Sequence, residues 1–246
     1  MGLLIPNHHY GPLGFDISEY LKIRHYDDQA EIEKRSNRSG GHYTEAASAP
    51  SGLFIPKYTD IDHLRNLGDK FFRYGELVIV TEKIHGANAR YAWRDGSLHT
   101  ASRNEWKKIR EGSIWYEALT VPMYNLIKLI SPYVLVGEIY GKGVQDLSYC
   151  KDRPTFIGFD IYNPELQKYL DTSELKGWLE GFKIPMVPIK YVGGYDYGEI
   201  KALAEENSEL CEGQLSEGVV VRPFYDRVNN RGERIILKYP SERYYE

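Results

Sequence analysis

The chain has 246 residues, of which 42% are hydrophobic, so it can bury the core of one large domain or of one domain with an appendage. Its 31 basic and 35 acidic residues give a net charge of −4, which excludes polyanion binding over the whole surface and leaves local basic patches for that role. The two cysteines, Cys150 and Cys211, do not form a disulfide framework and indicate a reducing compartment. We find no signal peptide and no run of transmembrane length, and therefore expect a cytoplasmic protein.

The N-terminal part differs from the rest in composition. Residues 36–52 are mostly small and polar, which is typical of a linker. We therefore predict an N-terminal extension with its linker over residues 1–52 and a globular domain over residues 53–246.

A candidate nucleophile follows the first apolar strand of that domain. The run Leu77–Val80 predicts a strand over residues 76–82, and Lys83 stands at its end, three residues before Gly86. A lysine amine becomes a good nucleophile when it is partly desolvated or lies beside other cations. The apolar strand before Lys83 favours this role, as does Gly86, which would let a ligand approach the backbone. Taken alone the motif is weak, and an exposed lysine at a strand end is then the better explanation.

The remaining elements predict an α+β domain. Asp95-Gly96 is typical of a hairpin turn between two strands, Pro122 is expected to break or restart a helix, and Asp171 with Glu174 resembles a capping box. The expected strands are residues 88–93, 98–102, 133–140, 155–162, 217–223 and 234–238, and the expected helices are residues 113–130, 171–181 and 199–207.

Single charges stand in several of these apolar strands. A buried charge is unfavourable unless it is paired or bound to a ligand or metal. Each charge by itself is explained by a strand end that reaches water, but together they indicate one polar cleft between sheets. The residues concerned are Glu138, Asp160, Glu217, Arg222 and Lys238.

Six motifs in order carry a resemblance to a known superfamily. They are Glu-Lys-Ile-His-Gly-Ala-Asn at 82–88, Ser-Arg-Asn at 102–104, Gly-Glu-Ile-Tyr-Gly at 137–141, Phe-Asp-Ile at 159–161, Glu-Gly-Val-Val-Val-Arg at 217–222 and Ile-Leu-Lys at 236–238. The series resembles the covalent lysine nucleotidyltransferases, and within them the RNA ligase 2-like group, from about Phe54 to the C-terminus. His85 favours that group, because related DNA ligases and capping enzymes usually carry Asp at this place.

The resemblance implies a fold and a reaction. The fold would be a nucleotidyltransferase (ATP-grasp-like) domain of antiparallel sheets flanked by helices, with the active site between the sheets, over residues 53–246. Residues 1–52 are too few for a complete OB-type domain and would be its remnant. Lys83 would attack ATP and carry AMP, which then moves to a nucleic-acid 5′-phosphate before a 3′-hydroxyl displaces it.

The resemblance also implies roles for individual residues. Arg103 and Lys238, and then Arg222, would contact phosphates, because arginine gives a forked contact and lysine a point charge. Glu138 would accept hydrogen bonds from the ribose and Phe159 would stack on adenine. Glu217 and Asp160 would hold Mg²⁺ or Mn²⁺. The other residues expected to bind the nucleotide are Glu82 and Ile84, through backbone groups, with His85 and Asn88.

The chain departs from the family pattern at two places. Arg222 stands where many relatives have lysine, which keeps the charge. Pro240 stands where the last motif usually has a second lysine. A shorter pattern, Lys238…Ser241…Tyr244, would fit a bacterial and phage branch of the group. If Ser241 and Tyr244 do not complete the last motif in this way, one phosphate contact for adenylyl transfer is missing.

The expected substrate is RNA, or an RNA-containing duplex with a nick, and a partner protein would replace the accessory domains. Two basic runs are candidate contacts, and solvated loops explain them equally well because acidic residues dilute both. A DNA ligase, a GTP-dependent capping enzyme and a non-catalytic binding module are the alternatives. His85 counts against the first two, and the joint presence of Lys83, Glu138, Glu217 and Lys238 counts against the third. The runs are Arg103, Lys107, Lys108 and Arg110, and Arg227, Arg231 and Arg234.

Overall fold

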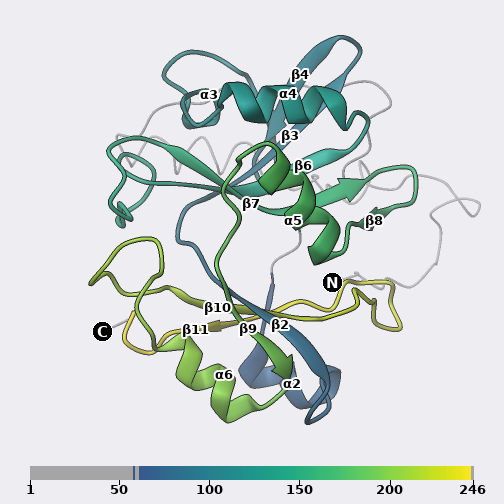
Figure 1. The fold of residues 1–246 in the computed structure, drawn as a ribbon, viewed down its shortest axis with the longest axis vertical. Helices are drawn as coiled ribbons and strands as arrows, with labels where there is room; N and C mark the ends of the chain where they lie inside the picture. The colour runs from purple at the N-terminus through teal and green to yellow at the C-terminus, as the bar shows by residue number, and fades with distance from the viewer. Residues whose placement is uncertain (1–57, 59–60, 245–246) are drawn as a thin grey trace, which may run out of the picture. The chain divides into compact units, whose positions relative to one another are not determined.

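The computed structural model describes Tyr58 and residues 61–244, which belong to the compact unit Thr44–Glu246 (Figure 1). The extension, linker and OB remnant predicted at residues 1–52 lie outside the described residues. None of the helices in the described part is both long enough and apolar enough to cross a membrane.

The first sheet is built from segments far apart in the sequence. It packs against two helices, α2 (Leu64–Phe71) and α6 (Tyr197–Ala204), which lie on the same side of it (Figure 1). All its neighbouring strands are antiparallel except β1 and β11, which are parallel. In spatial order the strands are β1 (Asp62–His63), β11 (Leu237–Pro240), β10 (Gly218–Pro223), β2 (Leu77–Glu82) and β9 (Ile189–Gly194).

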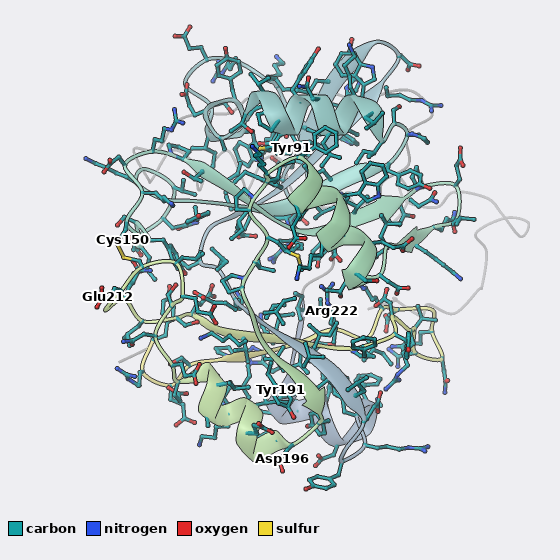
Figure 2. All side chains as sticks on the ribbon, viewed as in Figure 1. Tyr91, Cys150, Tyr191, Asp196, Glu212 and Arg222 are labelled. Atoms are coloured by element: carbon teal, nitrogen blue, oxygen red, sulfur yellow. A yellow bond between two sulfur atoms is a disulfide. The ribbon has the colours of Figure 1, made fainter. Side chains whose placement is uncertain are left out.

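The second sheet is antiparallel throughout and holds the larger core. Helices α4 (Val121–Leu129) and α5 (Thr172–Gly181) cover it, with the short α3 (Ile114–Glu117) beside them. Tyr91 is fully buried in this core, whereas Arg222 lies where the two sheets face each other (Figure 2). In spatial order the strands are β5 (Trp106–Lys107), β4 (Ser97–Ala101), β3 (Ala87–Arg94), β6 (Val134–Tyr140), β7 (Thr155–Asn163) and β8 (Lys168–Tyr169).

Local sequence signals explain several element boundaries. Asp95 and Gly96 adopt φ of 50° and 73°, as a tight hairpin turn requires. Pro122 lies in the first turn of α4, where its missing N–H costs no hydrogen bond, and Thr120 caps that helix through Met123 N. The capping box predicted at Asp171 and Glu174 is present.

Other boundaries differ from the prediction. Helix α6 begins at Tyr197 rather than 199, because the Asp196 side chain accepts a hydrogen bond from Glu199 N and caps the helix there. Strand β11 begins only at Leu237, after a loop in which Arg234 makes an isolated bridge with Val228. Helix α2 and strand β9 were not predicted, although Leu64, Leu67 and Phe71 stand at helical spacing in α2.

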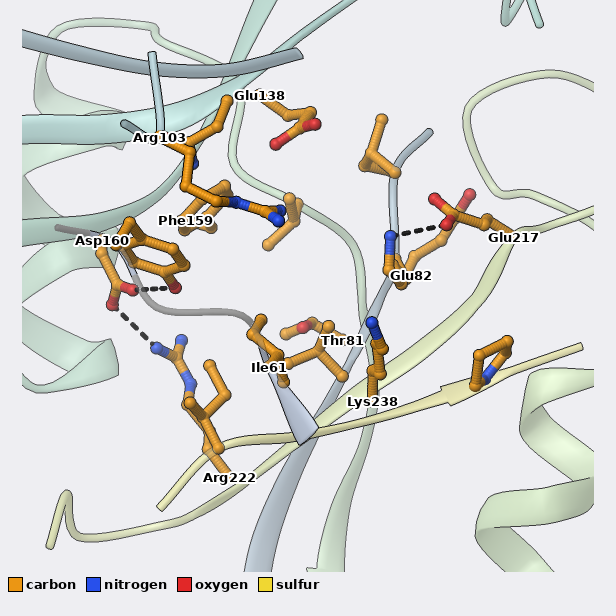
Figure 3. Close-up of a pocket in the computed structure, with 18 residues that line it drawn as sticks. Ile61, Thr81, Glu82, Arg103, Glu138, Phe159, Asp160, Glu217, Arg222 and Lys238 are labelled. Atoms are coloured by element: carbon orange, nitrogen blue, oxygen red, sulfur yellow. Dashed lines mark hydrogen bonds and ion pairs between the residues drawn. The ribbon is translucent and has the colours of Figure 1, made fainter. Parts of the chain in front are cut away.

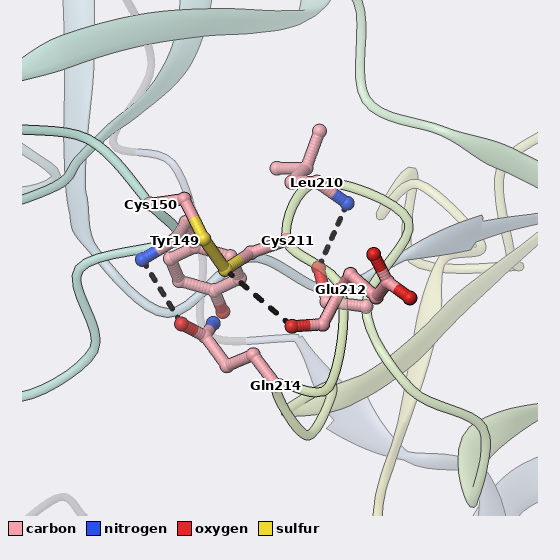
Figure 4. Close-up of a disulfide and its surroundings, with 7 residues drawn as sticks. Tyr149, Cys150, Leu210, Cys211, Glu212 and Gln214 are labelled. Carbon is pink, nitrogen blue, oxygen red and sulfur yellow. Dashed lines mark hydrogen bonds between the residues drawn. A yellow bond between two sulfur atoms is a disulfide. The ribbon is translucent and has the colours of Figure 1, made fainter.

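The structure also joins the two cysteines, for which the sequence indicated no disulfide framework. Cys150 and Cys211 form one disulfide across 61 residues of chain (Figure 4). Their two loops come together only through the fold, so the cysteine count could not show this bond.

Candidate active site

A cavity of about 290 Å³ lies between the two sheets (Figure 3). Strands of the first sheet contribute Glu82, Val220 and Lys238, and strands of the second contribute Asn88 and Glu138. The structure therefore brings together eleven of the twelve residues predicted for the site, all except His85. These are Lys83, Glu82, Ile84, Asn88, Arg103, Glu138, Phe159, Asp160, Glu217, Arg222 and Lys238.

Lys83 is held through its backbone by the first residue of β10 and through its side chain by the residue before it. Its backbone N–H donates to Gly218 O at 2.9 Å, and its Nζ donates to Glu217 Oε1 at 2.6 Å. The two side chains are only 23% and 11% exposed, so the ion pair is largely shielded from water. A lysine in this position is anchored at the cavity with a base in contact with its amine, which suits a nucleophile.

Gly86 has a different role from the one predicted. A Cβ at this position would lie 2.2 Å from Ile139 O and 2.9 Å from Glu138 Cγ. The glycine therefore lets the turn after Lys83 pack against β6, and no ligand is needed to explain it. This corrects the prediction that Gly86 opens the backbone to a ligand.

His85 lies outside the cavity wall, and its contacts concern the turn that carries Lys83. Its backbone N–H donates to the Tyr149 hydroxyl at 2.8 Å. Its Nδ1 is 3.8 Å from Glu217 Oε2, and its ring centroid is 5.6 Å from that of Tyr244. His85 is thus placed to orient Glu217 and the turn, and it does not line the cavity.

Glu138 lies on β6 opposite Asn88 of β3 and faces the cavity. Burial is the main reason that the pKa of Glu138 is raised to about 8. The nearby charges have smaller effects on this pKa: Lys83 and Arg103 lower it, and Glu217 raises it. A carboxyl with this pKa is mostly protonated at pH 7. It can therefore donate a hydrogen bond as well as accept one, which the sequence did not indicate.

The raised pKa of Glu138 makes a prediction about pH and stability. Between pH 4.5 and about 8 the folded chain keeps a proton that the unfolded chain has released, so this group lowers stability as pH rises through that window. Glu138→Gln resembles the protonated form at every pH. We expect its free energy of unfolding, relative to the wild type, to rise by more than about 1.4 kcal/mol across the window, the equivalent of one pKa unit. Denaturant titrations of both proteins at a series of pH values measure the difference, and parallel curves would contradict it.

A β-bulge explains why Phe159 and Asp160 both line the cavity although they are consecutive in β7. In the register of β6 with β7, Val136 pairs with Asp160 and Gly137 with Gly158, so Phe159 has no opposite residue. Consecutive side chains in a regular strand point to opposite faces, and the extra residue removes that alternation. Phe159 also contacts Tyr58, with ring centroids 5.5 Å apart.

Asp160, predicted as a metal ligand, is paired with two arginine side chains in the structure. Its carboxylate, 1% exposed, accepts from Arg222 Nη1 at 3.1 Å and from Arg234 at 2.6 and 3.0 Å. Tyr58 donates to it as well, at 3.1 Å. Two guanidinium groups already neutralise this carboxylate, so we do not assign Asp160 to a metal. We call these four residues, Tyr58, Asp160, Arg222 and Arg234, the aspartate cluster.

The remaining basic residues divide between the site and its surroundings. Lys238 lies on β11 opposite Val220 and faces the cavity, as predicted. Arg103 also lines it, and the Arg90 guanidinium supports its loop by donating to Ser102 O at 2.6 Å and Arg103 O at 3.2 Å. Sequence reasoning missed Arg90, which has no motif around it.

Ser241 and several residues of the two basic runs have protein partners in the structure, where phosphate contacts were predicted. The Ser241 hydroxyl donates to Glu205 Oε2 at 2.7 Å and is buried, which leaves it no contact with a phosphate. In the basic runs, Arg234 belongs to the aspartate cluster, Arg227 pairs with Glu76 at 2.7 Å, and Lys107 pairs with Glu105 at 2.5 Å.

Several cavity residues were not predicted, because apolar wall residues carry no chemical motif. They are Tyr58, Ile61, Thr81, Val187, Val220, Ile236 and Pro240. Among the described residues, buried Asn88 Oδ1 and Glu217 Oε2 have no hydrogen-bond partner. Unpartnered polar atoms beside the apolar wall residues fit a ligand with a flat apolar part and a polar edge.

Comparisons with known proteins give a family and several similar folds. The model of the family RNA ligase matches residues 76–240. A Naegleria gruberi RNA ligase with PPi is 21% identical, with a TM-score of 0.68 over 94% of this chain and 66% of that chain. A lysine-to-methionine mutant of a Naegleria gruberi RNA ligase with AMP and Mn is 20% identical, with a TM-score of 0.66 over 96% of this chain and 68% of that chain. A comparison with curated proteins finds no match.

These matches establish the fold and the family. The solved structures confirm the mixed α+β architecture of antiparallel sheets, and the chain spans about two thirds of the length of the first of them, 66%. The family match extends from Glu76, just before β2, to Pro240 at the end of β11. It therefore includes both sides of the cavity. The chain belongs to the RNA ligase family.

Proposed function

We propose that this protein is an ATP-dependent RNA ligase that forms a covalent lysine–AMP intermediate on Lys83. The observation that carries the proposal is the Lys83–Glu217 pair, 2.6 Å apart, at a cavity that also contains Arg103 and Lys238. The solved Naegleria gruberi ligases include forms with ATP and Mn and with AMP and Mn, which supports the same nucleotide and a divalent cation here.

The residues around Lys83 define the first step. Glu217 takes a proton from the Lys83 amine, and the amine attacks the α-phosphorus of ATP. A nitrogen–phosphorus bond forms, the bond to the bridging oxygen breaks, and pyrophosphate leaves. Arg103 and Lys238 neutralise charge on the phosphates, which an attack on an anion requires.

The nucleoside lies between Phe159 of the second sheet and the end of β2 in the first. Phe159 offers an apolar ring for the adenine, and the backbone around Glu82 and Ile84 faces its edge. Protonated Glu138 and Asn88 Oδ1 are placed for the ribose hydroxyls, so one carboxyl can donate while the amide oxygen accepts. These contacts set the α-phosphorus in front of Lys83.

A divalent cation supplies charge neutralisation for the phosphates. Within the described part of the chain no group of three His, Cys, Asp or Glu side chains could hold a metal. Glu217, with its unpartnered Oε2, is the carboxylate of this chain that fits a cation shared with ATP and water.

Glu217→Gln tests that role. The variant keeps the size of the side chain and removes its charge, so we expect the Mn²⁺ concentration needed for half-maximal adduct formation to rise at least about tenfold. Adduct formation measured over a Mn²⁺ series gives this value. An unchanged metal requirement together with a slower reaction would leave Glu217 as the base only.

The deciding experiment incubates the purified protein with labelled ATP or GTP and a divalent cation, followed by gel analysis of the protein. We expect an acid-labile adduct with ATP. Preferential labelling by GTP would move the protein to the capping enzymes. Absence of any adduct would favour a non-catalytic binding module.

RNA, in a nicked duplex or with templated ends, is the proposed substrate. With net charge −4 the chain neutralises few phosphates, so its binding to nucleic acid should be weak. A duplex holds the two reacting ends together, which removes an entropic cost from the enzyme. We expect nicks with RNA on the 3′-hydroxyl side to be sealed faster than single-stranded RNA is joined. Rates on matched all-DNA, RNA-containing and single-stranded substrates test this, and faster sealing of all-DNA nicks would indicate a DNA ligase.

A further inference from the structure

The disulfide joins two loops that both contact the neighbours of Lys83. Cys150 lies in the loop of residues 141–154 between β6 and β7, and Cys211 lies in the loop of residues 205–217 between α6 and β10. Cys150 is exposed and Cys211 is half-buried, so small thiols can reach the bond. Each loop also contacts the segment that carries the nucleophile.

The first loop reaches that turn through Tyr149. Tyr149 is fully buried, and its hydroxyl accepts the backbone N–H of His85 at 2.8 Å. Its own N–H donates to Gln214 Oε1 of the second loop at 3.0 Å, directly beside the disulfide (Figure 4). The position of Tyr149 therefore depends on both loops.

The second loop reaches the residue before Lys83. Glu209 N donates to Glu82 Oε2 at 2.9 Å, and the same loop leads into Glu217, which pairs with Lys83. The disulfide thus closes a ring of contacts around the segment Glu82–His85. A change in the distance between the two loops would act on Lys83 from both sides.

The backbone beside the disulfide is strained. Tyr149 and Cys150 have φ of 48° and 55°, a left-handed conformation that residues other than glycine seldom adopt. Such a conformation persists when its surroundings hold it in place. The bond to Cys211 is a covalent constraint of this kind on the backbone beside Tyr149.

We propose that Cys150 and Cys211 are a redox modification site whose oxidised state holds Lys83 and Glu217 in the geometry for adenylylation. The reactant is a small thiol of the glutathione or dithiothreitol class. Its thiolate attacks Cys150 Sγ, the bond between the two cysteines breaks, and Cys211 leaves as a thiolate. A second thiol displaces Cys150 from the mixed disulfide, so both cysteines end as protonated thiols and the reductant as its disulfide.

The proposal rests on the proposed function for its rate measurement but has a second measurement that does not. Wild-type protein, oxidised or reduced with dithiothreitol and verified by mass, is tested for single-turnover formation of the AMP adduct. We expect reduction to slow it about 5- to 10-fold, the range expected for one lost hydrogen bond, and reoxidation to restore it. Hydrogen exchange of the His85 amide should become faster on reduction by a similar factor.

Three variants separate the steps. The double variant Cys150→Ser/Cys211→Ser is the matched control; it should react at the reduced rate and ignore dithiothreitol. Tyr149→Phe keeps the disulfide but lacks the hydroxyl acceptor, so it should also react slowly in both states. Cys211→Ser alone should match the double variant.

Two results would overturn the inference. Equal adduct rates in the oxidised and reduced wild type, with only a lower thermal midpoint on reduction, would make the disulfide a structural staple. If neither state forms an adduct, the proposed function fails and the His85 amide decides alone: unchanged exchange on reduction overturns the redox link, and faster exchange supports it.

Discussion

Lys83→Ala is expected to abolish the covalent AMP adduct completely. The methyl group cannot attack phosphorus, and no other lysine among the described residues takes the same place, at the end of β2 and 2.6 Å from Glu217. The second cavity lysine, Lys238, approaches from β11 and is the proposed phosphate contact. The measurement is gel analysis with labelled ATP, supported by peptide mapping of the wild-type adduct to Lys83.

The control for this prediction is Lys83→Arg. The substitution keeps a cation beside Glu217, so the buried carboxylate is not left unpaired and folding should be maintained. A guanidinium remains protonated and is no nucleophile at neutral pH, so the adduct should still be absent. Labelling of Lys83→Ala at the wild-type level would refute the assignment of the nucleophile.

Asp160→Ala is expected to destabilise the protein by about 3–5 kcal/mol, because the buried Arg222 loses its carboxylate and Arg234 keeps only Asp226. Arg222 and Arg234 are both largely shielded, and each donates to Asp160. The cluster also connects β7 of the second sheet with β10 of the first, so its loss should loosen the cavity wall. Equilibrium unfolding in denaturant measures the change in free energy.

Tyr58→Phe is the matched control in the same cluster. It removes one hydrogen bond to Asp160 and leaves both ion pairs, so we expect a loss of only about 1 kcal/mol. A stable Asp160→Ala protein with an altered requirement for Mn²⁺ would instead return Asp160 to the metal site. Equal losses in both variants would show that the ion pairs add nothing beyond the hydrogen bond.

The sequence by itself determined where the main strands lie along the chain and which residues make up the site. Strands such as β2 and β6 are apolar runs with a single charge, and that pattern is local, so it is readable without the fold. The capping box at Asp171 and the turn at Asp95-Gly96 are local for the same reason. Ordered motifs, read through a family resemblance, then predicted eleven residues that line one cavity.

Only the tertiary structure decided what each charged residue contacts. Asp160 meets Arg222 and Arg234 across 62 and 74 residues of chain, and no local pattern shows whether a carboxylate will face a metal or a guanidinium. The bulge at Phe159 depends on the register with β6, and Gly86 on the approach of Ile139 O. The disulfide between Cys150 and Cys211 likewise depends on two loops that the sheets bring together. Contacts over such separations are set by the arrangement of the sheets, which is why the sequence predicted the members of the site and the structure decided their roles.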